Sequence, residues 1–559
     1  MKILNAILKK NVPRKFDFNH ADFSLLSGIS IVINQLKVSE NPAFKNHPLK
    51  DYDRFYTDET MRVSIKALPL FVAKVSMKEM HMEKPFFHVL RNEKKELSVD
   101  DLFKGNKGPV LGWLNVDQWT ISNGTLRFID AAAPRRAFVA LFSNLNATIS
   151  GLSVHEIFKV NISLKGPGSP KPNCFFDGTA GPINDAANLS QVPVSMNFRL
   201  KDAKIANYSA YFAPGLPFPI SGLVSIGYQV NGDFWSGLHM KGSSVVHDLT
   251  LSSDDGREKK SIPFTLGMSL NQSMIFSMKE EKLTIENAEI QLNRSRFIID
   301  GTISRISENP WMDIRLAATG IDLDDIKQIY PFHGEYMPDS FIYSGRSGMT
   351  LHMKGDQKKV ILSGRIDFSD TLLEVTGFFR KNPSDKLLLQ VDASTFPQTK
   401  RFEGTGSVQS GAIEIFTPKG YQRFRETLCR HFHLETGPCS SHNSFSETPV
   451  VAESMEGHVA FSDDQIILEN VTLKNCRQGA KEGIDAMVSG WVDLIKKRIY
   501  LAGEAVLSLK ESASLLSARP ADKSIIRDEM GRIHLPITIS GGIEKPVIQL
   551  DHTIFEAPE

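Results

Sequence analysis

Long apolar runs, tryptophan and cysteine are all scarce in this chain of 559 residues. No window approaches 18 uninterrupted apolar residues, so we expect no transmembrane helix. The N-terminal apolar stretch, residues 3–8, is shorter than the core of a secretory signal and has no cleavage site after it. Four cysteines are too few for a disulfide scaffold. The net charge of +1 argues against a nucleic-acid binder, which would carry a basic excess.

The sequence motifs of common enzymes are also missing. There is no G-x-S-x-G, H-E-x-x-H or C-x-x-C motif, and the absence of any Gly-Lys dipeptide excludes a P-loop. We therefore predict that the protein is not an enzyme and uses no cofactor. The alternative is an enzyme with an unrecognised site, which would show clustered carboxylates in a pocket.

One cluster contains residue types that bind zinc: Cys429, His431, His433, Cys439 and His442. Its spacing matches no common structural zinc site, so we predict no metal. In an oxidising compartment, a disulfide between Cys429 and Cys439 would close a short loop. The remaining interpretation is that both thiols are free, on a helix followed by a loop.

Alternation of apolar and polar residues is frequent along the chain and predicts a mainly β protein. We expect strands at residues 61–67, 121–129, 283–292, 297–303, 466–473 and 499–509. Helices are expected to be few and short, at residues 46–58, 322–330, 419–432 and 507–518.

Internal repeats support this prediction. Glycines ten residues apart bound the segments 222–232, 345–355 and 531–541, and every second residue inside each segment is mainly apolar. Each segment is therefore a strand with one apolar and one polar face. Residues 364–375 resemble residues 457–468, and both contain Phe-Ser-Asp. A third repeated pattern places Asn123, Asn287 and Asn470 between apolar residues, where asparagine suits a turn or a bulge.

A sheet with one apolar face must cover that face. Periodicity alone favours ordinary sandwiches, in which two apolar faces pack together. The alternative is a curled sheet whose apolar face lines a groove for lipid chains. In that case the groove-lining candidates are Val224, Ile226, Tyr228, Val230, Met349, Leu351, Met353, Ile366, Phe368, Val459 and Phe461.

Both ends of the chain resemble the AsmA family of bacterial envelope proteins. The N-terminal resemblance rests on residues 23–44, which contain an expected strand that ends in Glu-Asn-Pro. It also rests on residues 67–71, 83–92 and 97–103. The C-terminal resemblance rests on residues 488–494 and 535–551. Together, the two resemblances imply an AsmA-like N-terminal region at 1–130, a repetitive middle β-sheet region at 131–440 and an AsmA-like C-terminal region at 441–559.

The AsmA family is similar to TamB, YhdP and the bridge-like lipid transfer proteins. The resemblance implies an elongated, curled, taco-like β-sheet with an apolar inner groove, and it favours the groove over the sandwich. It also implies a non-enzymatic protein that conducts phospholipid and supports outer-membrane lipid homeostasis and assembly. The expected location is the periplasmic side of the inner membrane in Gram-negative bacteria.

The expected partners are phospholipid acyl chains, the inner membrane and an outer-membrane protein, with no nucleic acid. Family members usually begin with a transmembrane helix, which this sequence does not show. We expect either an anchor upstream of this sequence or a protein that is not anchored by itself. The competing function is a periplasmic scaffold that binds outer-membrane protein precursors by β-strand addition.

Overall fold

The computed structural model consists mainly of strands, which account for 72% of it, while helices account for 6%. This confirms the predicted fold class, a mainly β protein built from a many-stranded open sheet with few helices. Within the part of the chain that is described, no helix combines the length and apolar character needed to cross a bilayer. The described residues are 14–24, 29–44, 46–48, 54–67, 76–94, 96–99, 115–133, 136–183, 189–211, 220–252, 261–306, 309–325, 341–375, 379–396, 401–415, 426, 449–462, 465–477, 483–493, 496–518, 526–543 and 545–550.

The chain divides into two compact units. Unit 1 comprises Met1–Asn293 with Thr302–Glu308, and unit 2 comprises Arg294–Gly301 with Asn309–Glu559. The boundary between the two units falls within strand β18 (Ser295–Ser304). The region boundaries at residues 130 and 440 rest on the family resemblance and stay a prediction.

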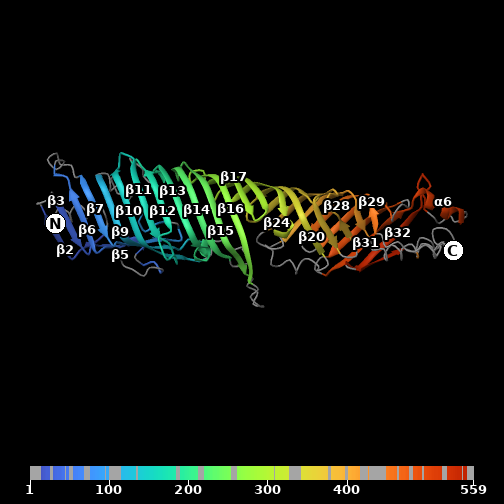
Figure 1. Ribbon diagram of the computed structural model, residues 1–559, viewed down its shortest axis with the longest axis horizontal. Coiled ribbons are helices and arrows are strands. Elements are labelled where there is room, and N and C mark those ends of the chain that lie inside the picture. The colour runs from blue at the N-terminus through green and yellow to red at the C-terminus, as the bar shows by residue number, and fades with distance from the viewer. Residues whose placement is uncertain are drawn as a thin grey trace. The chain divides into compact units, whose positions relative to one another are not determined.

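The main sheet of unit 1 runs through strands that lie side by side in Figure 1. From β9 to β17, each strand pairs antiparallel with the next one along the chain. In spatial order the strands are β2 (His20–Ser24), β3 (Ile29–Asn34), β6 (Thr60–Ile65), β7 (Met77–Glu83), β9 (Asn115–Asp130), β10 (Phe138–Ser153), β11 (Phe158–Lys165), β12 (Cys174–Ala180), β13 (Val194–Lys204), β14 (Ile220–Asp233), β15 (Gly237–Ser252), β16 (Ser261–Ser277) and β17 (Lys282–Leu292).

Strand β9 divides this sheet into two branches. Its first half pairs in parallel with β7, and its second half pairs in parallel with β8 (Phe86–Arg91). From β8 the second branch continues through β5 (Arg54–Thr57), β4 (Lys37–Ser39) and β1 (Phe16–Asp17). Val38 and Tyr56 of this branch share a buried cluster with Met77 and Met80, so the two branches pack on each other. The short 3₁₀ helices are η1 (Pro42–Phe44), η3 (Leu189–Gln191) and η4 (Ile205–Tyr211).

Unit 2 repeats this plan with antiparallel pairing. Its main sheet comprises β19 (Trp311–Asp322), β20 (Phe341–Gly355), β21 (Val360–Asp367), β24 (Leu387–Phe396), β25 (Arg401–Ser410), β28 (Ser454–Ser462), β29 (Gln465–Cys476), β30 (Ile484–Asp493), β31 (Arg498–Val506), β32 (His534–Gly542) and β33 (Lys545–Leu550). Strand β20 also begins a second branch through β22 (Thr371–Val375), β23 (Phe379–Lys381), β26 (Ile413–Ile415) and β27 (Val450–Ala452).

The helix predictions were partly correct. The segment 507–518 corresponds to helix α6 (Leu509–Ala518). The helix at 46–58 is wrong, because residues 54–57 form β5 and pair with both β4 and β8. Residues 323–325 are helical, but the rest of 322–330, and 419–432 apart from Glu426, lie outside the described residues. All six predicted strands are present, although the last, 499–509, ends at Val506.

The residues that punctuate the repeats adopt unusual backbone conformations. The six glycines bounding the segments 222–232, 345–355 and 531–541 all have positive φ, between 82° at Gly531 and 148° at Gly355. Asn123 and Asn470 have φ of 54° and 51°, and the pairing register shifts beside both. The predicted bulges are therefore confirmed at these two asparagines.

Candidate functional site

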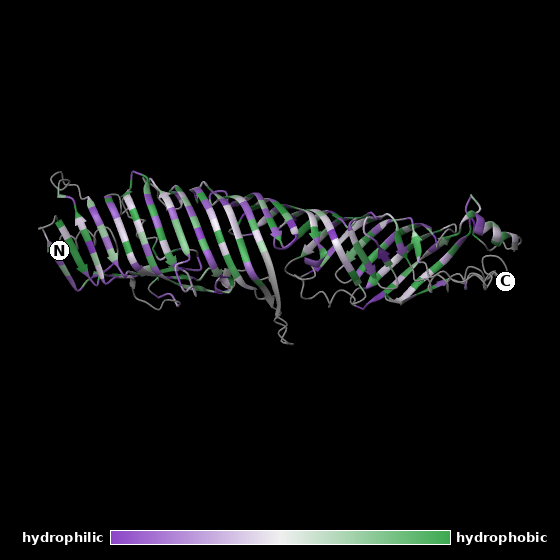
Figure 2. Ribbon diagram, in the orientation of Figure 1, coloured by the Kyte–Doolittle hydropathy of each residue, from purple (hydrophilic) through white to green (hydrophobic). Residues whose placement is uncertain are grey.

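One face of the unit 1 sheet carries rows of mainly apolar side chains. Residues paired directly across neighbouring strands project to the same face. Hydrophobic and hydrophilic residues accordingly alternate along the strands in Figure 2. In pairing order from β2 to β17, one row reads Phe23, Ile31, Val63, Met80, Trp119, Ile149, Val160, Gly178, Met196, Val230, Met240, Met274 and Ile285.

The opposite face of the same strands is polar. From β11 to β16, the adjacent row reads Asn161, Asp177, Asn197, Gln229, Lys241 and Ser273. Asp177 accepts hydrogen bonds there from Asn197 at 3.1 Å and from Arg199 at 2.9 Å. These side chains are exposed or half-buried, so water solvates this face and the sheet is amphipathic from β11 to β16.

Unit 2 has an equivalent apolar face, in which glycine recurs among larger residues. From β19 to β33, one row reads Leu316, Leu351, Gly364, Val391, Gly406, Val459, Leu468, Gly490, Leu501, Ile539 and Ile548. Gly490 has φ of 155°, and a Cβ there would collide with the Tyr500 carbonyl oxygen and approach Leu501 Cα. Small residues at such points let neighbouring strands approach and bend, as a curled sheet requires.

The structure brings most of the groove-lining candidates onto these two faces. Val224, Ile226, Tyr228 and Val230 lie on one face of β14, opposite Ala203, Leu200, Phe198 and Met196 of β13. Met349, Leu351 and Met353 of β20 share a face with Ile366 of β21, and Val459 and Phe461 of β28 lie in the same rows further along the sheet. Phe368 differs, because it follows the end of β21 in a turn.

The apolar faces are covered at one end of each unit. In unit 1 the second branch covers the N-terminal strands. In unit 2, Ile413 and Val450 of the second branch and Leu515 of α6 are buried against β29–β32 in one cluster. A cavity of about 40 Å³ remains in this cluster, lined only by apolar groups that include Cys476, Val488 and Ala505.

Elsewhere the apolar faces remain partly accessible. Val230, Met240, Met274 and Ile285 are half-buried, and so is the row from Met349 to Leu389. Among the described residues, none of β15, β16, β21 or β24 belongs to a hydrophobic core cluster, although residues such as Leu238 and Val246 of β15 and Ala393 of β24 are buried. A stretch of apolar face in the described part of each unit therefore stays partly accessible to solvent.

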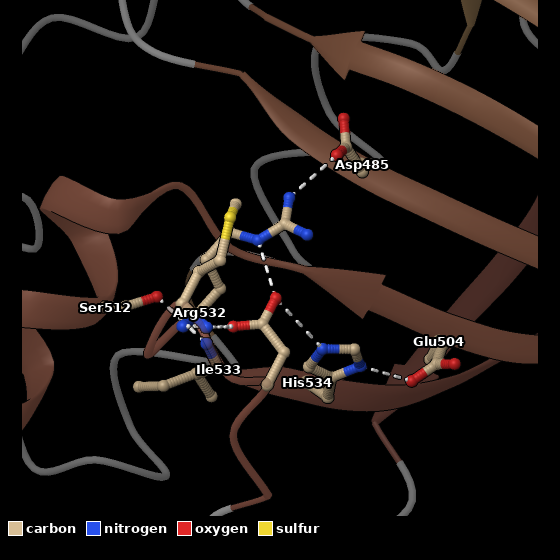
Figure 3. A network of polar contacts seen from close by, with 8 residues as sticks. Asp485, Glu504, Ser512, Arg532, Ile533 and His534 are labelled. Carbon is tan, nitrogen blue, oxygen red and sulfur yellow. Dashed lines mark hydrogen bonds and ion pairs between the residues drawn. The ribbon is translucent and has the colours of Figure 1, made fainter.

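A polar network fixes the strand order at the covered end of unit 2. Arg532 lies between two carboxylates, with its guanidinium 2.8 Å from Asp528 and 3.2 Å from Asp485. Figure 3 shows the contact with Asp485. His534 lies 2.7 Å from Glu504, and the Ser512 hydroxyl of α6 accepts a hydrogen bond from the Ile533 amide at 3.0 Å. These contacts tie α6 and residues 526–534 to β30 and β31, so the network holds the cover in place.

Two cysteines are described, and both are reduced and buried. Burial raises the pKa of Cys174 to about 11 and that of Cys476 to about 12, so both thiols stay protonated at neutral pH. The cluster of Cys429, His431, His433, Cys439 and His442 lies outside the described residues. Within the described ranges, no group of His, Cys, Asp and Glu side chains is arranged to hold a metal ion.

Sequence analysis missed most of the partner positions in each row. Met196 and Phe198 on β13 and Met240 on β15 lie opposite the candidates of β14. Alternation in residues 194–200 was a usable signal, but those residues belong to no repeat. Comparison with protein-family models, with curated proteins and with solved structures found no match.

Proposed function

We propose that this protein binds phospholipid acyl chains on the apolar faces of its two sheets and lets them move along those faces. The observation that carries the proposal is the apolar row from Phe23 to Ile285, in which glycine stands only at Gly178 and which stays half-buried at Met240 and Met274 on β15 and β16. The resemblance to the AsmA family supports the same function and suggests an envelope location on the periplasmic side of the inner membrane. An outer-membrane partner protein belongs to the same proposal.

The dimensions of the rows suit several lipids. Neighbouring strands lie about 4.8 Å apart, so the row across unit 1 spans roughly 55 Å along the sheet. One leaflet of a bilayer has a hydrocarbon thickness of about 15 Å, which is the length that one acyl chain spans. The row is therefore long enough for acyl chains of more than one phospholipid.

The energetics favour weak selectivity and easy movement. Covering apolar surface contributes about 25 cal/mol per Å², and this contribution does not depend on direction. A chain that slides along the row exchanges one apolar contact for another. Head groups would stay in water at the strand ends, where they need no specific partner.

Mass spectrometry of organic extracts from the purified protein tests the proposal. The protein should carry several phospholipids per chain, and Ile226→Asp or Leu351→Asp should lower that number because each places a charge on the apolar face. Gln229→Asp and Thr350→Asp are matched controls on the polar face of the same strands and should keep the lipid. A stable, folded wild-type protein without lipid would contradict the proposal.

The competing proposal is a scaffold that binds extended peptides by strand addition. Strand β2 lies at the N-terminal edge of the unit 1 sheet and pairs with β3, and β33 is the last strand and pairs with β32. Edge strands offer unpaired backbone groups to an added strand. Peptide binding that is blocked by proline substitutions in β2 or β33, together with lipid-free extracts, would favour this function.

A further inference from the structure

The face of unit 2 opposite its apolar row carries Thr350, Arg365, Gln390, Ser407 and His458 from β20 to β28, and it changes character near the C-terminus. From β29 to β33, one row on this face reads Ile467, Trp491, Tyr500, Ser540 and Val547. Ile467 is 37% exposed, while Tyr500 and Val547 are each 44% exposed. The corresponding face of β13–β16 carries polar side chains in the row through Gln229, so an exposed apolar row is unexpected here.

Two aromatic rings form the centre of this row. The Trp491 and Tyr500 rings stack, with centroids 6.2 Å apart and planes 25° apart. Neither ring points into the apolar face, because Gly490 and Leu501 occupy the adjacent positions that face it. This pair, with Tyr500 exposed and Trp491 half-buried, combines apolar area with polar N–H and O–H groups, which suits an interface between hydrocarbon and water.

Basic residues border the aromatic pair. Two positions beyond the Trp491–Tyr500 pair, toward the β30–β31 turn, Asp493 pairs with Arg498. Arg498 therefore projects to the same face as Tyr500. Lys496 and Lys497 in the turn are exposed, and Lys496 lies 3.2 Å from the buried Asp493 carboxylate. An apolar-aromatic row thus lies beside three consecutive basic residues.

We propose that this outer C-terminal patch, formed by Ile467, Trp491, Lys496, Lys497, Arg498, Tyr500 and Val547, docks onto the surface of a membrane that contains anionic phospholipid. Tryptophan and tyrosine favour the head-group level of a bilayer, and lysine and arginine are attracted to anionic head groups. The basic charge beside these rings therefore selects an anionic membrane over a neutral one. The patch lies on the opposite face from the lipid-binding rows, so this inference goes beyond the proposed function.

Co-sedimentation with vesicles tests the docking. The full chain should bind vesicles of phosphatidylcholine mixed with phosphatidylglycerol more tightly than vesicles of phosphatidylcholine alone, and added salt should weaken the binding. Replacing Lys496, Lys497 and Arg498 together with Gln should weaken it roughly tenfold or more. The double variant Trp491→Ala, Tyr500→Ala should also weaken binding while the protein stays folded, with a small fall in the thermal unfolding midpoint, because Tyr500 is exposed and Trp491 is half-buried.

A matched control is available in the β20–β21 turn. Lys358 and Lys359 are exposed there near Ile361, which is 51% exposed, and the aromatic ring beside Lys359 is the half-buried Phe396, 5.5 Å from its ammonium. The combined variant Lys358→Gln, Lys359→Gln, Ile361→Ala should bind vesicles within about twofold of wild type, because this turn lies outside the outer C-terminal patch and has no Trp-Tyr pair.

Two results would overturn the docking proposal. One is binding that does not depend on phosphatidylglycerol or that survives both sets of substitutions. The other is self-association in ultracentrifugation that the Trp491 and Tyr500 substitutions abolish, which would make the patch an interface between copies. Neither result affects the lipid content of organic extracts, so failure here is distinguishable from failure of the proposed function.

Discussion

The side chains of Tyr228 on β14 and Gln272 on β16 meet across Gly242 on β15, where the Gln272 amide donates a hydrogen bond to the Tyr228 hydroxyl. Gly242 makes this contact between non-adjacent strands possible. A Cβ there would lie 2.7 Å from both Cα and Cδ1 of Tyr228. A polar contact therefore interrupts one of the apolar rows, and it lies among the strands where that face is half-buried.

Gly242→Ala should destabilise the protein by about 2 kcal/mol, because the new methyl group overlaps the Tyr228 ring and strand backbone. Gly227→Ala is the matched control, since a Cβ at Gly227 has no neighbour within 4 Å, and its effect should stay within about 0.5 kcal/mol. Urea unfolding midpoints measure both. Equal effects of the two substitutions would show that Gly242 is not a close-packing position.

The Tyr228–Gln272 pair predicts a non-additive double-mutant cycle. Tyr228→Phe should cost about 1–2 kcal/mol, because it leaves the half-buried Gln272 amide without its acceptor. Adding Gln272→Leu should recover most of that loss, since an apolar pair of similar shape suits the row. Unfolding of the two single variants and the double variant measures the coupling free energy. Simple additivity would contradict a direct contact.

Lys381 is a second buried polar residue that fixes the branch point of unit 2. Its side chain is fully buried, and its ammonium donates to the carbonyl oxygens of Phe368 at 2.6 Å, Thr371 at 2.9 Å and Ser369. Burial lowers the pKa of Lys381. The three carbonyls belong to the turn where the chain leaves β21 and enters the second branch at β22.

Lys381→Met should therefore destabilise unit 2 by about 3 kcal/mol or more, since buried carbonyl groups lose their donor. Lys386→Met provides the control, because Lys386 is exposed and its ammonium donates to the Gln409 side chain rather than to backbone carbonyls of the turn. Its effect should stay within about 0.5 kcal/mol. Similar urea midpoints for the two variants would show that the turn does not depend on the ammonium.

Local patterns were predictable from the sequence, whereas pairing between distant strands was not. The alternation in residues 224–230 identified the apolar face of β14, because a period of two is a property of the strand itself. The helix predicted at 46–58 failed because Tyr56 pairs with Val38 and Phe87, and tertiary pairing overrides local propensity. Neither the division of β9 nor the burial of Lys381 leaves a local signal. The second branches that cover one end of each apolar face also depend on pairing between distant strands. The sequence alone therefore could not distinguish a closed sandwich from an open groove.

The asparagine bulges give a prediction about backbone strain. At Asn470 φ is 51°, a conformation that costs most side chains about 1–2 kcal/mol and costs asparagine and glycine less. Asn470→Val should lower stability by about that amount, while Asn470→Gly should be nearly neutral. Thr472→Val on the same strand is the control, because it lies beyond the bulge in regular pairing. Equal losses for valine and glycine would assign the effect to the asparagine side chain instead.

The buried thiol of Cys476 makes stability depend on pH in the alkaline range. Burial raises its pKa to about 12 from an ordinary value of 9.0, so the folded state keeps a proton that the unfolded state releases above pH 9. The raised pKa therefore contributes stability that is present below pH 9 and lost as pH rises toward 12. At pH 10.5 the loss should reach about 2 kcal/mol.

Replacing the thiol separates this effect from other alkaline titrations. Cys476→Val keeps an apolar side chain of similar size in the cluster beside the 40 Å³ cavity, so the fold should be retained. Between pH 8 and pH 10.5, urea unfolding midpoints should fall less steeply for this variant than for wild type. Cys174→Val should reduce the slope by nearly the same amount, because its folded pKa of about 11 also lies above this pH range. Identical slopes for wild type and Cys476→Val would mean that the thiol is accessible and titrates normally, which would contradict the sealed end of the apolar face in unit 2.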